Sequence, residues 1–264
     1  IVLGIFVYFP FFKTIIESFF LLNSMGEVRE FIGFENYINI FSNSKFIQSI
    51  FNSIKFAIFT VPFTVGLSFI LAMMAAKKRP ASPVYETLFS LPMAMSTSVA
   101  AMIFELMFSP TLGIVNSITG LNIKWLSDRN TAMWVLIVIQ VWMNLGYNFL
   151  FILAAIRGMS KEVTESARLD GANDLTIFVK MVLPLSKAVL ATMVLFYAVG
   201  FWNQWLQPLI YLNDRSRFPM QLILRNIVLG TDAALSKSMS ASADMATMSL
   251  NIKYAVIFIT ILPI

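Results

Sequence analysis

The sequence has no cysteine and no histidine among its 264 residues. Without cysteine the chain cannot form disulfides, thiolate metal sites or thiol nucleophiles. Without histidine it lacks the commonest metal ligand and the commonest general base. The two absences leave little conventional active-site chemistry and argue against a metal-dependent or nucleophilic enzyme.

Charge is also scarce. Only 12% of the residues are charged, 58% are hydrophobic, and the mean hydropathy is +0.77. A water-soluble domain needs a more polar surface than this composition can supply. The formal net charge is +5, but the basic residues lie in short loops between apolar runs and form no single stripe for nucleic acid. We therefore expect an all-α polytopic membrane protein, with the lipid bilayer as its solvent and no nucleic-acid partner.

The apolar runs set the number of spans. A membrane-spanning helix needs about 20 mainly apolar residues. Four stretches meet this length, and they are 51–76, 84–108, 132–156 and 185–212. Two terminal segments, about 1–20 and 252–264, have shorter apolar parts, and we interpret them as spans cut through the helix in a fragment. The sequence thus predicts a single transmembrane domain of about six helices, the first and the last truncated.

The basic residues orient these spans. Lys77, Lys78 and Arg79 follow the second span, and the positive-inside rule places such a cluster in the cytoplasm. Alternation then puts the loop 157–184 and both termini inside, and 213–251 outside. Because 213–251 has no sustained apolar run, we expect an outer loop in which only 218–229 forms a short helix.

The inner loop 157–184 is too polar to span the membrane and too long for a simple turn. Its pattern predicts a helix over 161–169 with Ser160 as N-cap, ended by Gly171. A second helix is predicted over 174–182, and Pro184 should stop or kink the chain where the fifth span begins. We expect a small helical knob on the cytoplasmic membrane surface.

A spaced pattern runs through this loop, and its members are Glu165, Ser166, Ala167, Gly171, Leu183 and Pro184. The pattern resembles the "EAA" loop of binding-protein-dependent ABC importer permeases, which reads Glu-Ala-Ala, three residues, Gly, nine residues, Ile, one residue, Leu-Pro. This chain keeps every spacing and departs at Ser166 and at Met181, where the family has Ala and Ile. The plain alternative is a set of solvated charges on a connecting helix, and the register with Gly171 and Leu183-Pro184 argues against it.

The resemblance implies that the loop docks in a groove of an ATPase subunit. Closure of two ATPases on ATP would then swing two permeases between inward-facing and outward-facing states. Gly171 would permit the bend and a close approach. No glycine is followed by lysine, so ATP and magnesium belong to the partner subunits, and this chain is expected to bind no cofactor or metal and to be no enzyme. The implied coupling residues are Glu165, Ser166, Ala167, Arg168, Asp170, Gly171, Ala172, Leu183 and Pro184.

The resemblance extends over nearly the whole chain and points to the carbohydrate-uptake branch. FIGFENYINIF at 31–41 is similar to the entry before the second span in that branch. Segments 91–116 and 125–148 resemble the first-permease type of sugar and sugar-phosphate importers, whereas 183–214 and 218–227 resemble the partner-permease type of oligosaccharide importers. The resemblance implies a sugar or oligosaccharide importer in the inner membrane of a bacterium or archaeon, with a second permease, most simply as a heterodimer, and an extracytoplasmic solute-binding protein. The mosaic leaves open which partner permease the chain accepts.

Polar side chains inside spans normally face a bundle interior or a water-filled path. Amides beside aromatic rings suit a neutral, hydroxyl-rich substrate. Amides also join helices, and tryptophans near span ends anchor them at the interface, so packing is the competing interpretation. Gly146 would allow close helix approach. Residues at helical spacing on the fourth and fifth spans give the candidate substrate path. On the fourth span they are Asn144, Tyr147 and Asn148, in a stripe that begins at Gln140. On the fifth span they are Gly200, Asn203, Gln204 and Gln207.

Other functions remain open at this stage. The same fold could import an amino acid or phosphate, because the loop does not report the substrate; a metal cargo is disfavoured by the missing histidine and cysteine. An ion-driven secondary transporter also has broken helices and midplane polar residues, but it would need no ATPase. A membrane enzyme would need a convergent acid, base or nucleophile set, for which the spans hold too few ionisable residues.

Overall fold

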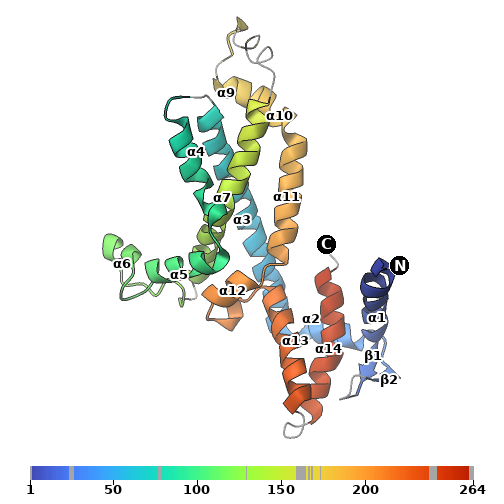
Figure 1. The fold of residues 1–264 in the computed structure, drawn as a ribbon. Helices are drawn as coiled ribbons and strands as arrows, with labels where there is room; N and C mark the ends of the chain where they lie inside the picture. Colours follow the sequence, from blue (N-terminus) through green and yellow to red (C-terminus); the bar gives the residue numbers. More distant parts are fainter. Residues whose placement is uncertain are drawn as a thin grey trace. The chain divides into compact units, whose positions relative to one another are not determined.

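The computed structural model describes residues 2–261 except 24–26, 77–78, 129, 159–164, 166, 168, 173 and 238–242. The chain divides into two compact units, residues 1–54 with 202–264, and residues 55–201 (Figure 1). We call them the first unit and the second unit and take each in turn. Both are built mainly of helices, as the predicted fold class requires.

Two long apolar helices give the second unit its frame. Helix α3 (Ser44–Ala76) enters it from the first unit, and α7 (Ala132–Arg157) lies wholly within it; both are long and apolar enough to cross a membrane. Ser68 Oγ donates to the Leu145 carbonyl oxygen at 3.3 Å, so the two helices lie against each other. Helix α3 begins before the predicted residue 51 because Asn43 Oδ1 accepts from the Lys45 backbone N at 3.0 Å and caps a polar first turn.

The predicted span 84–108 is not one straight helix. The structure has α4 (Ser82–Ser90), the short 3₁₀ turn η2 (Leu91–Ala94) and α5 (Thr97–Met107), with a bend of 102° between the two parts. Ser96 Oγ accepts from the Val99 backbone N at 3.3 Å and so caps a new helix after the bend. The short helix α6 (Ile114–Thr119) follows and ends at Gly120, whose φ is +68°.

The fifth predicted span, 185–212, is also interrupted. A helical stretch precedes it, formed by α9 (Asp174–Ile177), the π-turn η3 (Phe178–Val182) and α10 (Leu183–Leu185). The chain then bends by 55° into α11 (Lys187–Trp202), two residues beyond Pro184. Helix α11 ends at Trp202 because Pro208 cannot donate to the Gln204 carbonyl and its ring crowds that group. Pro208 instead occupies the first turn of α12 (Leu206–Tyr211) in the first unit.

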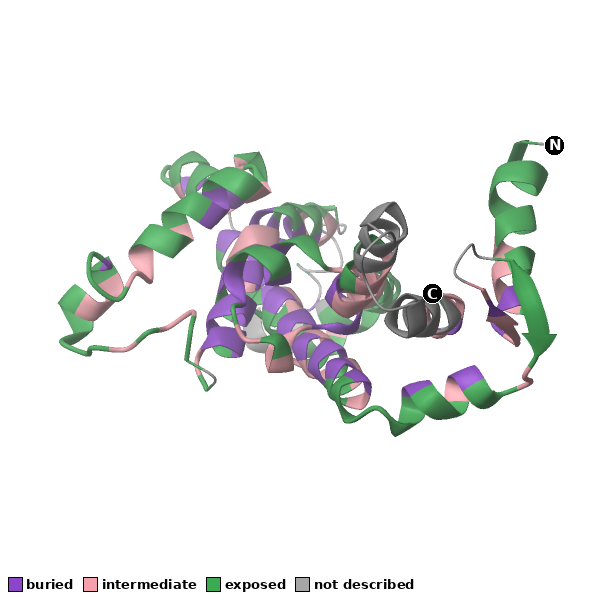
Figure 2. Ribbon diagram, turned by 90° about the horizontal axis from the view of Figure 1, so that it is seen from below, coloured by how far each residue is buried: buried purple, intermediate pink, exposed green. Residues whose placement is uncertain are grey.

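The first unit begins with the π-turn η1 (Gly4–Tyr8) and α1 (Phe9–Glu17), exposed along most of its length (Figure 2). A two-stranded antiparallel hairpin follows, β1 (Phe20–Leu22) and β2 (Val28–Phe31), which the sequence analysis did not predict. The rings of Phe20 and Phe31 pair across it with centroids 5.3 Å apart. The first predicted span, about 1–20, therefore ends in this hairpin.

Helices complete the first unit. They are α2 (Glu35–Ser42), the 3₁₀ turn η4 (Arg215–Arg217), α13 (Met220–Lys237) and α14 (Ala243–Ile261). The prediction that 213–251 is a loop with a helix only over 218–229 is therefore wrong, while its placement on the outer side stays a prediction. Alanine, methionine and leucine are strong helix formers, so the missing apolar run excluded a span but not a helix.

Buried polar bonds join the start of α3 to the start of α13 within the first unit. Asn52 Nδ2 donates to the Ser216 carbonyl oxygen at 2.8 Å, and Ser53 Oγ accepts from the Met220 backbone N at 2.8 Å. Beside them lies an apolar core of five buried side chains, which are Ile40, Phe46, Met220, Ala255 and Val256. In apolar surroundings satisfied polar groups of this kind fix the position of one helix end on another.

By length and composition, the described residues hold two helices able to cross a membrane, or up to four if each bent pair is one span. The second, third and fourth predicted spans and the first part of the fifth correspond to these elements. Shorter apolar helices lie at 220–229 and 252–261. The last of these corresponds to the predicted terminal span, although its helix begins earlier, at Ala243.

Candidate functional site

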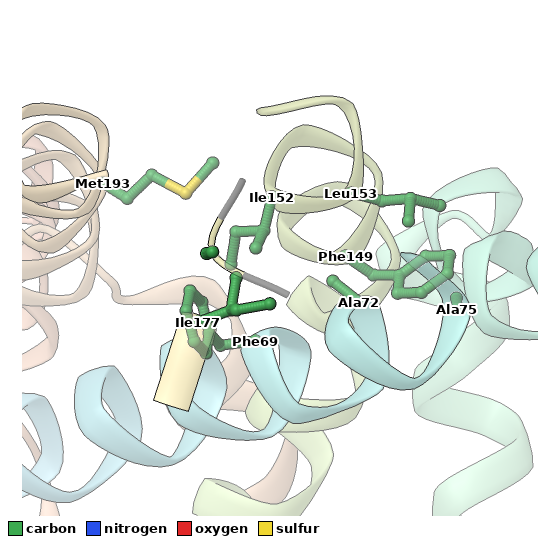
Figure 3. Close-up of a cluster of buried hydrophobic side chains, with 9 residues drawn as sticks. Phe69, Ala72, Ala75, Phe149, Ile152, Leu153, Ile177 and Met193 are labelled. Atoms are coloured by element: carbon green, nitrogen blue, oxygen red, sulfur yellow. The ribbon is translucent and has the colours of Figure 1, made fainter. Parts of the chain in front are cut away.

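The loop 157–184 is anchored on a cluster of buried apolar side chains in the second unit (Figure 3). The cluster draws on α3, α7 and α11, and the loop contributes Ala167 and Ile177, whose exposed fractions are 4% and 5%. Ala172 and Met181 pack against it and are partly buried. The buried members are Phe69, Ala72, Ala75, Phe149, Ile152, Leu153, Ala167, Ile177 and Met193. We call this set the anchor cluster.

Gly171 ends the first helical segment of the loop. Its φ is +82°, in the left-handed region, and the Ala172 backbone N donates to the Ala167 carbonyl oxygen at 2.9 Å. A hydrogen bond from a backbone N to the carbonyl oxygen five residues earlier, with a left-handed glycine just before the donor, is the Schellman motif that ends a helix. In this motif the residues that supply the donor and the acceptor usually make an apolar contact. Here Ala167 and Ala172 both pack on the anchor cluster. The prediction that Gly171 breaks the helix is confirmed.

The close approach predicted at Gly171 is not made to any described residue of this chain. A Cβ placed on Gly171 would meet nothing within 4 Å. The positive φ is therefore what requires glycine at this position. The side of the backbone that would carry a Cβ is open.

The opposite side of the loop is exposed. Leu169 has an exposed fraction of 89%, and Glu165, Asp170 and Gly171 are exposed beside it. The sequence analysis did not single out Leu169, although it stands one helical turn after Glu165 and so shares its face. Ser160, Ser166 and Arg168, with most of the predicted 161–169 helix, lie outside the described residues.

The end of the loop follows the same division. Met181, at the position where the family has Ile, packs against the anchor cluster, whereas Leu183 and Pro184 are exposed. The predicted 174–182 helix is present as α9 followed by η3. The spaced pattern thus alternates between residues that attach the loop to its own chain and residues that face outward.

On α7 the candidate amides bond to their own helix. Asn144 Nδ2 donates to the Gln140 carbonyl oxygen and Asn148 Nδ2 to the Asn144 carbonyl oxygen, each at 2.8 Å. Asn148 is fully buried, while Tyr147 is 44% exposed and its ring lies 4.5 Å from that of Phe151. These two bonds stay within α7, but the Asn148 side chain also hydrogen-bonds with the Tyr197 side chain of α11, as the packing interpretation would require.

Gly146 does permit a close helix approach. A Cβ there would lie 2.9 Å from the Ser90 carbonyl oxygen, a distance that real Cβ atoms essentially never show. The backbones of α7 and α4 therefore touch at this point, as predicted. Phe89 and Phe149, one residue before and three residues after this contact, meet edge to face with centroids 5.4 Å apart.

On the fifth predicted span the candidate residues do not share one helical face. Gly200 is in α11, Asn203 and Gln204 lie in the break after Trp202, and Gln207 is in α12. The helical spacing in the sequence was misleading because Pro208 interrupts the helix. In the first unit, Gln207 is buried and Asn203 and Gln204 are partly exposed.

Helix α13 supplies two residues to this break that the sequence analysis missed. Gln221 Nε2 donates to Asn203 Oδ1 at 2.9 Å, and the Arg225 guanidinium lies over the Trp205 ring, 4.9 Å from its centroid. Gln221 and Arg225 are one helical turn apart and so share a face. Both lie in the predicted helix 218–229, and they were missed because sequence spacing does not show that this helix contacts the break at 203–205. Within the described ranges, no group of three or more His, Cys, Asp or Glu residues could hold a metal ion.

Long apolar helices, broken spans and a polar loop seated on their shared core define a polytopic membrane protein. Residues 41–263 match the family model described as "Binding-protein-dependent transport system inner membrane component", and the chain belongs to this family. The family resemblance inferred from the spaced pattern in the loop is confirmed.

Curated relatives agree with this assignment. The chain is 30% identical over 214 residues to "Probable ABC transporter permease protein YurN" of Bacillus subtilis (strain 168), covering 78% of this chain and 73% of that protein. It is 31% identical over 189 residues to "sn-glycerol-3-phosphate transport system permease protein UgpA" of Yersinia pseudotuberculosis serotype I (strain IP32953), covering 70% and 64%. The match with UgpA thus spans less than two thirds of that relative.

Solved structures show the same fold. A chain of a bacterial ABC transporter involved in the import of the acidic polysaccharide alginate superposes with a TM-score of 0.75 at 19% identity, covering 99% of this chain and 89% of that chain. The alginate transporter in complex with an alginate pentasaccharide-bound periplasmic protein gives the same TM-score and identity, with coverages of 99% and 88%.

Proposed function

We propose that this chain is a permease subunit of an ATP-driven, binding-protein-dependent importer that moves sugars or oligosaccharides across the cytoplasmic membrane. The observation that carries the proposal is the exposed helix end formed by Glu165, Leu169, Asp170 and Gly171, held in place by the Gly171 cap and by Ala167 in the anchor cluster. Family membership supports it, and the names of the relatives favour sugar-related cargo. The loop would lie in the cytoplasm with both termini.

Leu169 is the natural anchor for an ATPase subunit. Leaving a leucine exposed forgoes about 1.5–3 kcal/mol of burial free energy, and Leu169 is 89% exposed in a segment too polar to lie in lipid. Glu165 and Asp170 are exposed next to it. The matching surface would be an apolar groove with basic or polar groups at its rim.

Movement of the docked loop would reach the spans through the anchor cluster. Ala167, Ile177 and Met181 contact side chains that belong to α3, α7 and α11. Because packed interiors have low compressibility, a displacement of the loop displaces these helices as well. This supports alternating access driven from the loop, with ATP and magnesium held by two partner ATPases and no hydrolysis on this chain.

The remaining partners and the substrate path follow from the same proposal. A second permease would complete the path, and an extracytoplasmic solute-binding protein would deliver the cargo. Residues with amide or aromatic groups on or beside the spans would contact hydroxyl groups of the sugar. We assign this role to Asn144, Tyr147, Asn148, Asn203, Gln204 and Gln207, and we place Gly200, which has no side chain, on the same path.

Leu169→Asp tests the docking surface in the complete transporter. We expect this variant to lose co-purification of the ATPase subunits and ATP-dependent uptake, because a carboxylate cannot enter an apolar groove without a large desolvation cost. Leu169→Met keeps the apolar contact and is the matched control, which should retain both. Normal co-purification and uptake by Leu169→Asp would contradict the docking role. Uptake that survives removal of ATP but not of an ion gradient would instead identify a secondary transporter.

A further inference from the structure

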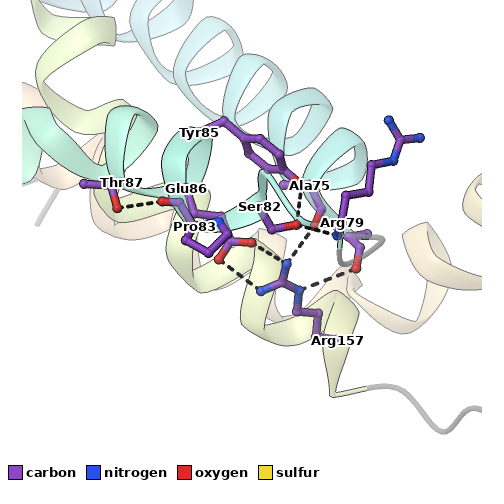
Figure 4. Close-up of polar contacts among 9 residues, drawn as sticks. Ala75, Arg79, Ser82, Pro83, Tyr85, Glu86, Thr87 and Arg157 are labelled. Carbon is purple, nitrogen blue, oxygen red and sulfur yellow. Dashed lines mark hydrogen bonds and ion pairs between the residues drawn. The ribbon is translucent and has the colours of Figure 1, made fainter.

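Arg157, the last residue of α7 and the first of the loop 157–184, binds the end of α3 and the Glu86 side chain of α4 (Figure 4). Its Nη2 and Nη1 donate to Glu86 Oε1 and Oε2 at 2.6 and 3.2 Å. The same Nη2 donates to the Ala75 carbonyl oxygen at 2.9 Å, and Nε to the Ala76 carbonyl oxygen at 3.5 Å. One guanidinium thus contacts α3, α4 and α7.

The chemistry of these contacts explains why arginine is needed. Ala75 and Ala76 end α3, and the last carbonyls of a helix have no intrahelical donor and carry the negative end of its dipole. Glu86 offers a carboxylate that a planar guanidinium binds through two donors at once. A lysine ammonium is a point charge and cannot hold all four oxygens in this plane. The Arg157 and Glu86 side chains are 25% and 23% exposed, so water only partly competes for the bonds.

The pair lies at the edge of the anchor cluster. The Ala75 side chain belongs to that cluster together with Ala167 of the loop. Tyr85, next to Glu86, packs against the same cluster, and its hydroxyl lies 2.7 Å from Ser82 Oγ. Ser82 Oγ in turn accepts from the Arg79 backbone N at 2.7 Å, which fastens the α3–α4 turn.

We propose that Arg157 is a positioning residue which, with Glu86, locks α3 and α4 to α7, so that a displacement of the loop moves the three helices as one body. The inference rests on the proposed function and adds to it the residues through which movement of the loop reaches α3 and α4. Apolar contacts in the anchor cluster press helices together but have little directional preference. The four oxygens bound by Arg157 fix both direction and register.

The solute-binding protein acts on the outer side of the membrane, whereas the ATPases bind on the inner side. Its stimulation of ATP hydrolysis therefore measures how well movement passes between the helices and the loop. The complete transporter in proteoliposomes is compared with Arg157→Lys, Glu86→Gln and the control Lys13→Gln. The control breaks an ion pair elsewhere, with Lys13 Nζ 3.6 Å from Glu17 Oε1. Uptake per ATP hydrolysed, the KM for ATP, subunit co-purification and the thermal midpoint of the complex are recorded for each variant.

We expect Arg157→Lys to lower both the stimulation and the uptake per ATP by about threefold to tenfold, a usual range for couplings between sites. Glu86→Gln, which keeps one acceptor oxygen, should lower them less, and Lys13→Gln should match the unchanged protein. The KM for ATP and subunit co-purification should stay the same in the unchanged protein and in all three variants. The thermal midpoints of Arg157→Lys and Glu86→Gln should fall slightly, because each loses charge-assisted bonds. A pair that only stabilised the fold would lower the midpoint without changing the uptake per ATP hydrolysed.

Unchanged stimulation in an assembled Arg157→Lys transporter would overturn the inference. If the Arg157→Lys transporter does not assemble, the stimulation measured with Glu86→Gln tests the inference instead. If the Glu86→Gln transporter does not assemble either, the pair is needed for stability, and the inference is overturned as well. The proposed function fails separately, when the unchanged transporter takes up no sugar. Stimulation by the binding protein still tests the Arg157 pair in that case, because the measurement does not depend on the cargo.

Discussion

The loop around Gly171 and the chain break around Asn203 both interrupt helices, but different forces position them. At 165–172 the chain turns through a left-handed glycine and rests on small apolar side chains. At 203–205 it turns ahead of Pro208 and is held by an amide pair and by an arginine stacked on a tryptophan. The first interruption is tied to a packed core, and the second is lined by groups able to bind hydroxyls.

This difference suggests a division of labour. A coupling element must transmit displacement, and close packing in the anchor cluster serves that need. A substrate path must exchange hydrogen bonds with a passing ligand, so its groups must stay accessible or only loosely engaged. Substitutions in the loop and its support should therefore disturb assembly and coupling, whereas substitutions at the break should disturb apparent affinity.

The largest effect is expected at the support of the loop, from Gly146→Ala. The new Cβ would lie 2.9 Å from the Ser90 carbonyl oxygen, so α4 and α7 must separate. Overpacking of this kind typically costs about 1–3 kcal/mol, and the purified protein should show a lower thermal midpoint. Gly66→Ala on α3, where a Cβ meets nothing within 4 Å, is the matched control and should leave the midpoint unchanged or slightly higher. Equal midpoints for the two variants would refute the helix contact.

A smaller effect on stability but a clear one on coupling is expected from Gly171→Ala. Alanine at a φ of +82° costs about 1–2 kcal/mol, because its Cβ crowds the neighbouring carbonyl. The helix end should shift, so ATP-dependent uptake should fall by about tenfold, the factor that such an energy represents. The control is Gly120→Ala, with a φ of +68° and the same open space away from the loop. If Gly120→Ala lowers uptake equally, strain alone is responsible and the loop has no special role.

The sequence predicted the loop better than it predicted the break, and the reason is physical. Gly171 has a positive φ, which glycine adopts much more easily than other residues, so the glycine in the sequence pattern marks the helix end in the structure. The prediction that Gly200, Asn203 and Gln207 share one helical face required a continuous helix, and Pro208 interrupts that helix. Nothing in a one-dimensional pattern places Arg157 against the end of α3 and against Glu86 of α4, because those bonds join residues more than seventy positions apart.

Periodicity failed in a second place for a related reason. The predicted span 84–108 satisfied length and hydropathy, yet it bends by 102° between Ala94 and Thr97. Pro92 lacks a backbone donor and Ser96 is a good N-cap, and both signals are present in the sequence. Hydropathy measures whether a segment tolerates lipid, whereas caps and prolines decide whether it is one helix.

The smallest effect is expected at the break, from Asn203→Ala. Removing the amide deletes a group able to bind a sugar hydroxyl and also its bond to Gln221, 2.9 Å long. One neutral hydrogen bond contributes about 0.5–1.5 kcal/mol, so the KM for uptake should rise by about threefold while the maximal rate and the ATPase stimulation stay near their original values. Asn39→Ala, an exposed amide on α2, serves as the control and should leave the KM unchanged. A fall in maximal rate or in stimulation without a change in KM would place Asn203 in the coupling machinery and erase the division between the two regions.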